Sequence, residues 1–136
     1  MCLLKRKRKT RRNGLAVVEF AVMLPILTLI VFATIEATSM IFLQQSLEIA
    51  AYEGTRASLV PDATESEVSD IVDEILNARG VQSATVTVDP LDFNSQPYGT
   101  FIHVSVSAPC NDNSLLAPWF YRGRTLTADV EMMKEY

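Results

Sequence analysis

The chain has 136 residues, of which 12 are Lys or Arg and 16 are Asp or Glu, giving a formal net charge of −4. That length suits one small domain rather than two, and an apolar share of 49% argues against a disordered chain. Two Cys and one His exclude a disulfide-rich scaffold, a four-cysteine zinc site and a histidine-based metal cluster.

The charge divides into a basic leader and an acidic body. Residues 1–14 contain no acidic residue and seven basic ones: Lys5, Arg6, Lys7, Arg8, Lys9, Arg11 and Arg12. The rest of the chain contains five basic and sixteen acidic residues, a balance of 5 − 16 = −11. Such a body repels phosphate, so we expect no nucleic-acid partner. The division predicts that the leader and the body lie in different compartments.

A long apolar segment follows the leader. Phe20–Ile35 contains no charged residue, and the apolar character resumes through Leu43. The run without charge is slightly shorter than the roughly 20 residues that a spanning helix needs. The flanking residues 15–18 and 37–43 make the length ample, so we predict a transmembrane helix over residues 15–43. The hydroxyl groups within it can bond to the helix's own carbonyls: Thr28, Thr34, Thr38 and Ser39.

The basic leader predicts the orientation of this helix. Lys and Arg beside a span stay on the cytoplasmic side. We therefore expect a single-pass protein of a bacterial inner (cytoplasmic) membrane, with its N-terminus in the cytoplasm and its C-terminal domain in the periplasm or outside the cell.

Two glutamates flank the apolar run. A carboxylate within the hydrocarbon region costs about 2.5–3.5 kcal/mol on insertion scales, so it usually has a partner and a function. We expect Glu36 to lie at the membrane interface, where this cost falls away. The residues around Glu19 favour a functional role instead.

The sequence around Glu19 reads Arg11-Arg-Asn-Gly-Leu-Ala-Val-Val-Glu-Phe-Ala-Val-Met-Leu-Pro-Ile-Leu27. A Gly ends the basic leader, Glu is the fifth residue after it, and an aromatic residue follows. This pattern is similar to the cleavage site of type IV prepilins. More specifically, it resembles the TadE-like family, which are pseudopilins of the tight-adherence (Flp, type IVb) pilus assembly system. The resemblance continues less specifically to Arg56 and covers about a third of the chain.

The resemblance implies roles for five residues. A prepilin peptidase would cut between Gly14 and Leu15 and free an α-amino group. Glu19, with Phe20 beside it, would direct assembly by pairing with that amine of its own or a neighbouring subunit. Pro25 is expected to kink the helix. The implied partners are the prepilin peptidase, other pilins or pseudopilins, the pilus assembly machinery and the lipid bilayer.

Beyond the membrane segment, the sequence predicts an α+β, pilin-like domain over residues 44–136. The first helix is expected to continue over 44–60 and to stop before Pro61. Small residues and one Leu recur on one of its faces: Leu47, Ala50, Ala51, Gly54, Ala57 and Ser58. Gln45, Tyr52 and Arg56 fall on the opposite face. Such a stripe lets a sheet approach closely.

A second helix and three strands follow. Residues 64–79 begin with a Thr64–Glu67 capping box and carry an apolar stripe: Val68, Ile71, Val72, Ile75 and Leu76. Apolar and polar residues alternate near 83–89, 100–108 and 124–133, which predicts an antiparallel three-stranded sheet. The acidic residues of the second helix fit a solvated face better than a calcium loop.

The sequence contains no recognisable catalytic set, so we expect neither an enzyme nor a cofactor. His103 falls on the polar face of a strand, and we expect it to be solvated. Cys110 is expected to be buried rather than paired with another chain. The aromatic segment 115–121 fits the core better than an exposed partner surface, although both interpretations stay open.

Two other functions remain possible from the sequence. A single-pass protein with a periplasmic interaction domain would never enter a filament. A secreted enzyme would need a signal-peptide cut near Ala37, but Ile35 stands where a small residue is needed. The sequence does not separate a TadE-like from a TadF-like role, nor incorporation into the pilus from help in its assembly.

Overall fold

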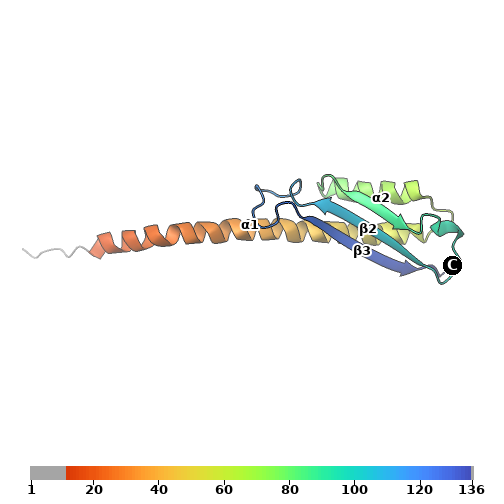
Figure 1. Cartoon of the computed structure of the whole chain (residues 1–136), viewed down its shortest axis with the longest axis horizontal. Coiled ribbons are helices and arrows are strands. Elements are labelled where there is room, and N and C mark those ends of the chain that lie inside the picture. Colours follow the sequence, from red (N-terminus) through yellow and green to blue (C-terminus); the bar gives the residue numbers. More distant parts are fainter. Residues whose placement is uncertain (1–11, 136) are drawn as a thin grey trace, which may run out of the picture. The chain divides into compact units, whose positions relative to one another are not determined.

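The computed structural model describes residues 12–135 (Figure 1), so Cys2 and the basic leader up to Arg11 lie outside the described residues. The elements in chain order are α1 (Arg12–Ser58), α2 (Glu65–Ala78), β1 (Thr85–Asp89), the short 3-10 helix η1 (Phe93–Ser95), β2 (Phe101–Pro109) and β3 (Thr125–Met133). The chain divides into two compact units, one up to Thr34 and one from Ile35 onward. The expected α+β class is confirmed.

The N-terminal unit is the apolar part of α1. Its large hydrophobic side chains between Leu15 and Phe32 are exposed. Among the described residues, α1 is the one helix that is long and apolar enough to cross a membrane. The Thr28 hydroxyl donates to the Leu24 carbonyl at 2.8 Å, and the Thr34 hydroxyl donates to the Ile30 carbonyl at 2.8 Å. These two hydroxyl groups are therefore satisfied within the helix, as the sequence predicted.

In the second unit, the rest of α1 buries the predicted small-residue stripe. Leu47, Ala50 and Ala51 are fully buried, and Gly54 is also buried, whereas Tyr52 on the opposite face is about half exposed. The stripe begins earlier than the sequence suggested, because Met40 and Leu43 also belong to the core. Residues 36–43 thus pack on the domain through one face.

Gly54 marks the closest approach between α1 and its neighbours. A Cβ at this position would lie 2.5 Å from Val72 Cγ2 of α2 and 3.3 Å from Val104 Cγ1 of β2. Real Cβ atoms essentially never come within 3.0 Å of another side chain. Only a residue without a side chain lets α1 contact α2 and the sheet together.

Helix α2 has the two ends that its sequence predicts. Thr64 and Glu67 form a complete capping box, and the hydrogen bonds from the Thr64 backbone and side chain lower the pKa of the Glu67 carboxyl. At the other end Gly80 takes a positive φ of 70°. The Val81 amide donates to Leu76 and the Gly80 amide donates to Asn77, which closes a Schellman motif. Val68, Val72 and Leu76 face the core, while Ile71 is 39% exposed.

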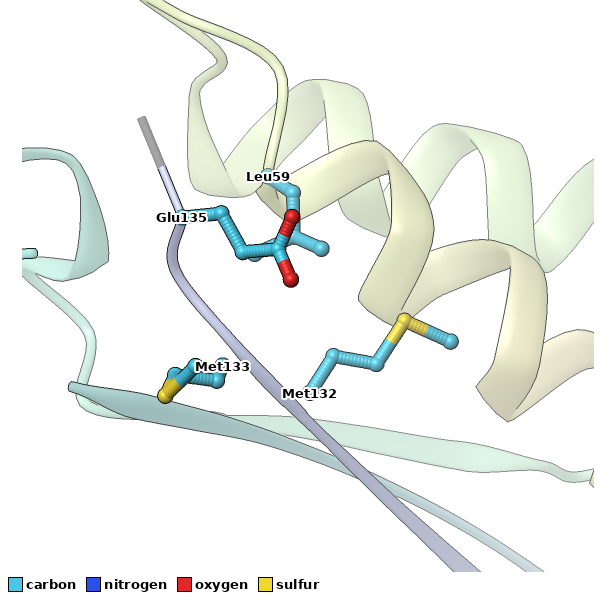
Figure 2. Close-up of a pocket in the computed structure, with 4 residues that line it drawn as sticks. All are labelled: Leu59, Met132, Met133 and Glu135. Atoms are coloured by element: carbon cyan, nitrogen blue, oxygen red, sulfur yellow. The ribbon is translucent and has the colours of Figure 1, made fainter. Parts of the chain in front are cut away.

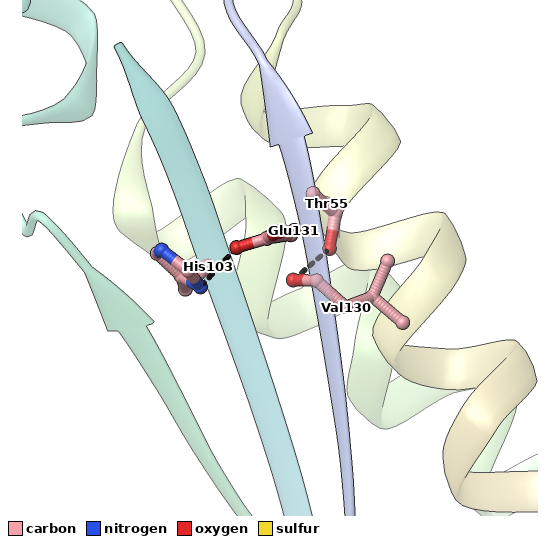
Figure 3. Close-up of polar contacts among 4 residues, drawn as sticks. All are labelled: Thr55, His103, Val130 and Glu131. Atoms are coloured by element: carbon pink, nitrogen blue, oxygen red, sulfur yellow. Dashed lines mark hydrogen bonds and ion pairs between the residues drawn. The ribbon is translucent and has the colours of Figure 1, made fainter.

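The sheet has the order β1-β2-β3, with both pairs antiparallel. Its apolar face joins the core together with α1 and α2, and the central strand buries Ile102, Val104, Val106 and Ala108. The other face is mostly polar and at least partly exposed, with the apolar pair Phe101 and Met133 at one end. On that face His103 of β2 lies opposite Glu131 of β3, with Nδ1 3.4 Å from the carboxylate (Figure 3). His103 is therefore solvated, as predicted.

Two side chains of α1 also reach backbone carbonyls of β3. The buried Thr55 hydroxyl donates to the Ala51 carbonyl at 2.7 Å and lies 3.4 Å from the Val130 carbonyl (Figure 3). Gln44 Nε2 donates to the Thr127 carbonyl at 3.4 Å. These contacts help to position α1 along the edge strand β3, because hydrogen bonds depend on geometry in a way that apolar packing does not.

We predict that Gly54→Ala destabilises the domain by about 1–3 kcal/mol, because its new methyl group overpacks against Val72. This loss would appear even though Ala stabilises an isolated helix by about 1 kcal/mol relative to Gly. Thermal unfolding of the full chain in detergent micelles, followed by circular dichroism, measures the effect.

A double-mutant cycle isolates the contact. Val72→Ala alone leaves a cavity, but Gly54→Ala combined with Val72→Ala should cost less than the two single changes together. Arg56→Ala, on the exposed face of α1, is the control and should leave the melting temperature almost unchanged. Additive losses in the double variant would contradict the close approach described above.

Candidate functional site

The residues of the predicted cleavage site belong to the first turns of α1. This helix begins at Arg12, three residues before the predicted start at Leu15. The Gly14–Leu15 peptide bond is therefore helical rather than part of a linker. A Cβ at Gly14 would meet nothing within 4 Å. The chain's own fold thus does not require glycine at this position.

Glu19 lies exposed on α1, next to the exposed Phe20. Within residues 12–135, its carboxylate makes no hydrogen bond and no ion pair. A carboxylate beside an apolar run is expected to have a partner. Any such partner must come from outside the part of this chain that the structure describes.

Pro25 lies inside α1, and the helix continues through it. Proline has no amide hydrogen, so the Ala21 carbonyl loses its usual donor four residues later. The nearby Thr28 hydroxyl bonds to Leu24, not to Ala21. Thr28 therefore does not replace the missing hydrogen bond, and the predicted kink stays a prediction.

Glu36 binds three consecutive backbone amides from the loop between β2 and β3. Its Oε1 atom accepts hydrogen bonds from the amides of Trp119 at 3.0 Å, Phe120 at 2.8 Å and Tyr121 at 2.8 Å. Glu36 is only 5% exposed. Successive amides that converge on one acceptor form an anion-binding concavity. We call this arrangement the Glu36 clasp.

The clasp gives Glu36 a protein partner that the sequence did not indicate, while its expected place at the membrane interface stays a prediction. Its carboxylate is shielded from solvent, and three donors compensate for the loss of water. Sequence reasoning missed this contact because the donors lie 83 to 85 residues away along the chain. The available signal was a carboxylate in an otherwise apolar helix, which usually has a partner.

The β2–β3 loop (residues 110–124) is held by further hydrogen bonds on either side of the clasp. Asn113 accepts from the Gln82 amide at 2.7 Å, and its Nδ2 donates to the carbonyls of Gln82 at 2.9 Å and Pro109 at 2.8 Å. Asn111 Oδ1 accepts from the Gly123 amide at 3.0 Å. The loop is thus anchored to the domain by side chains, although it contains no regular secondary structure.

The anchored loop presents aromatic side chains to the outside. Trp119 is 71% exposed and Phe120 is 60% exposed, and their rings stack with centroids 5.7 Å apart. Leu115 is exposed as well. The expectation that this segment belongs to the core is wrong for these residues. It holds only for Tyr121, which packs against the core and lies under the Arg124 guanidinium.

The other candidates offer less chemistry. His103 and Glu131 form one exposed pair. A surface hollow of about 440 Å³ near the end of β3 is lined by Leu59, Met132, Met133 and Glu135. The side chains of Met132 and Met133 project to opposite sides of the strand (Figure 2). A single carboxylate among apolar groups defines no reaction. The described residues contain no group of three side chains able to hold a metal.

Cys110 is fully buried at the start of the β2–β3 loop, as predicted. Burial raises the pKa of its thiol, even though Arg124 attracts the thiolate and opposes that change. A thiol in this state is a poor nucleophile. We therefore assign it a packing role.

These elements define a pilin-like arrangement, in which a long N-terminal apolar helix continues into a domain with a second helix and a three-stranded antiparallel sheet. Residues 14–56 match the family model described as TadE-like protein, so this segment is a TadE-like family domain. The match lies wholly within α1. No curated protein and no solved structure matches the chain. The TadE-like family implies a role in tight-adherence pilus assembly.

We predict that Glu36→Ala releases the β2–β3 loop. Each hydrogen bond to a charged group contributes about 1.5–3 kcal/mol, so the variant should lose at least that much stability. The amides of Trp119, Phe120 and Tyr121 should exchange with solvent much faster in the full chain. Hydrogen exchange followed by mass spectrometry or NMR measures this change.

Two variants control for unrelated effects. Glu36→Gln keeps an oxygen acceptor and should lose less protection than Glu36→Ala. Glu48→Ala removes an exposed carboxylate of the same helix, whose contact is with Gln44, and should leave the loop amides protected. Unchanged exchange in Glu36→Ala would show that the clasp does not hold the loop.

Proposed function

We propose that this chain is a minor pseudopilin of a tight-adherence (Flp) pilus assembly system. It would be made as a prepilin, inserted into the inner membrane, cut after Gly14 and then used as a structural component of pilus biogenesis. We assign it no reaction and no cofactor. The observation that carries the proposal is the TadE-like match, which begins at Gly14 and includes Glu19.

The absence of a partner for Glu19 among the described residues is consistent with an intermolecular role. The described part of the chain supplies no cation to it. Cleavage after Gly14 would create a cationic α-amine on Leu15, one helical turn before Glu19. In a surrounding of low dielectric constant, pairing with such an amine on another subunit is much stronger than in water. The same carboxylate would thus be unfavourable in an isolated subunit and satisfied in an assembly.

Exposure along α1 supports a membrane span over residues 15–35, shorter than the 15–43 expected from the sequence. The large apolar side chains from Leu15 to Phe32 are exposed, whereas Met40 and Leu43 pack in the domain core. Twenty-one residues rise about 32 Å at 1.5 Å each, which matches the hydrocarbon thickness of about 30 Å. The leader before it would stay in the cytoplasm. The domain after it would face the periplasm or the exterior.

We predict that Gly14→Val blocks processing. A Cβ at Gly14 meets nothing in this chain, so any loss of cutting reflects the peptidase and not misfolding of its substrate. N-terminal sequencing of the membrane form should give Leu15 for the parent and an uncut leader for the variant. Ala16→Val, a similar change on the other side of the bond, is the control and should still be cut.

The same measurement separates the alternatives. An intact leader in the parent would favour a single-pass anchored periplasmic interaction domain. A start near Thr38 would indicate a cleaved signal peptide. Efficient cutting of Gly14→Val would remove the prepilin assignment.

We predict that Glu19→Ala is inserted and cut normally but fails in assembly. Removal of a carboxylate lowers the cost of insertion, so the defect should appear only when subunits meet. Surface pilus yield, compared with the amount of processed protein in the membrane, measures it. Thr28→Ala is the control, because the Thr28 hydroxyl is satisfied within its own helix. Normal pilus yield from Glu19→Ala would reject this role.

A further inference from the structure

We propose that the β2–β3 loop is a second membrane contact, which lies in the headgroup region of the leaflet where α1 leaves the bilayer. Its exposed aromatic residues would sit at the boundary between acyl chains and headgroups. The proposal rests on the membrane span proposed above. It assigns a ligand, the lipid–water interface, to a surface that the core does not use.

The Glu36 clasp determines where this loop lies along α1. Glu36 is the first charged residue after the apolar run Phe20–Ile35. Its carboxylate holds the backbone of residues 119–121 through three hydrogen bonds of 2.8–3.0 Å. The loop is therefore fixed to the turn of helix at which the uncharged segment ends. In Figure 1 the loop between β2 and β3 lies at one end of the sheet, beside the part of α1 that contains Glu36 and belongs to the second unit.

The exposed residues have the composition of a membrane interface. Trp and Tyr are enriched at the level of the headgroups because an apolar ring and a polar group can each find a suitable surrounding there. Trp119 is 71% exposed, Phe120 is 60% exposed and Leu115 is 79% exposed. These three large apolar side chains have no use in the core. Burial in the interface would remove them from water.

The charge of the loop complements that of lipid headgroups. The body beyond the leader contains only five basic residues, and Arg122 and Arg124 are two of them. Both are exposed: Arg122 directly follows the aromatic residues, and Arg124 lies two residues further on, over the Tyr121 ring. Arg binds phosphate well, and basic residues near a membrane are attracted to anionic lipid by about 1 kcal/mol each. An acidic body that concentrates Arg here is suited to a phosphate-bearing surface.

The clasp also explains how a carboxylate can approach the bilayer. An exposed carboxylate at the hydrocarbon boundary would lose hydrogen bonds to water. Glu36 already has three protein donors and is only 5% exposed. The loop therefore covers the carboxylate with its backbone while it directs its apolar side chains outward. One arrangement thus satisfies the polar group and presents the lipid contact.

Trp119 is the only tryptophan of the chain and is a native fluorescent probe. We would place the full chain in phosphatidylcholine vesicles that contain lipids brominated in the upper acyl chain. The proposal expects blue-shifted Trp119 emission, loss of emission to brominated lipid and weak quenching by aqueous iodide. Addition of phosphatidylglycerol should increase the loss to brominated lipid, and Arg122→Ala should remove that increment.

A double variant, Trp119→Phe with Tyr98→Trp, moves the probe to the other end of the sheet. Tyr98 is 74% exposed, and the neighbouring Gly99 amide bonds to Lys134, beyond the far ends of β2 and β3. This variant should emit as a water-exposed tryptophan, insensitive to brominated lipid. Glu36→Ala, which releases the loop, should shift Trp119 toward the same behaviour.

Failure of this proposal is distinguishable from failure of the membrane span. Resistance to alkaline carbonate extraction reports insertion of α1 and tests the proposed function alone. If the chain is inserted but Trp119 is as open to iodide as the control probe, the loop does not contact lipid. If Trp119 is shielded from iodide without quenching by brominated lipid, a protein neighbour covers it. Either result overturns the proposal.

Discussion

The change of side-chain exposure along α1 is the constraint on which the rest of the described chain depends. From Leu15 to Phe32 its large apolar side chains are exposed, as a helix that crosses a membrane would require. From Met40 onward it buries one face against a sheet and a second helix. The change from the first pattern to the second occurs within about one turn. The same helix therefore contains an apolar segment long enough to cross a membrane and, further along, one wall of the domain core.

The buried face of α1 depends on small side chains because it has two neighbours. At Gly54 the side chains of Val72 and Val104 approach from α2 and β2 together. A larger residue would push away one of them, and the core of a small domain has little other apolar area to replace the contact. The close approach thus determines how both helices cover the sheet.

Two charged side chains hold the two long loops at opposite ends of the sheet. Glu36 accepts from three amides of the β2–β3 loop. At the other end the Lys134 ammonium donates to the carbonyls of Phe93, Asn94 and Gln96 at 2.8–3.2 Å. The Glu36 carboxylate thus faces amide hydrogens, and the Lys134 ammonium faces carbonyl oxygens, so each charge is stabilised by the backbone. The loops therefore need no regular secondary structure in order to be fixed.

Local patterns predicted the helices and strands, because their causes lie within a few residues. The capping box at Thr64, the glycine at position 80 and the alternation in β2 each determine structure over one or two turns. The small-residue stripe also predicted the buried face of α1. The Glu36 clasp and the exposed Trp119 required contacts between residues more than 80 positions apart. Periodicity contains no information about such pairs.

The Glu36 clasp joins the segment that matches the family model to a loop that lies outside it. The match ends at Arg56, so it includes Glu36 but none of the three amides that Glu36 binds. A carboxylate at the end of an apolar run within a helix needs donors, and this chain supplies them from a loop outside the matched segment. The identity of the donors therefore follows from the domain, not from the matched helix. The clasp is the place where the TadE-like helix and the rest of this chain depend on each other: the helix supplies an acceptor that requires compensation, and the loop gains a fixed position beside it.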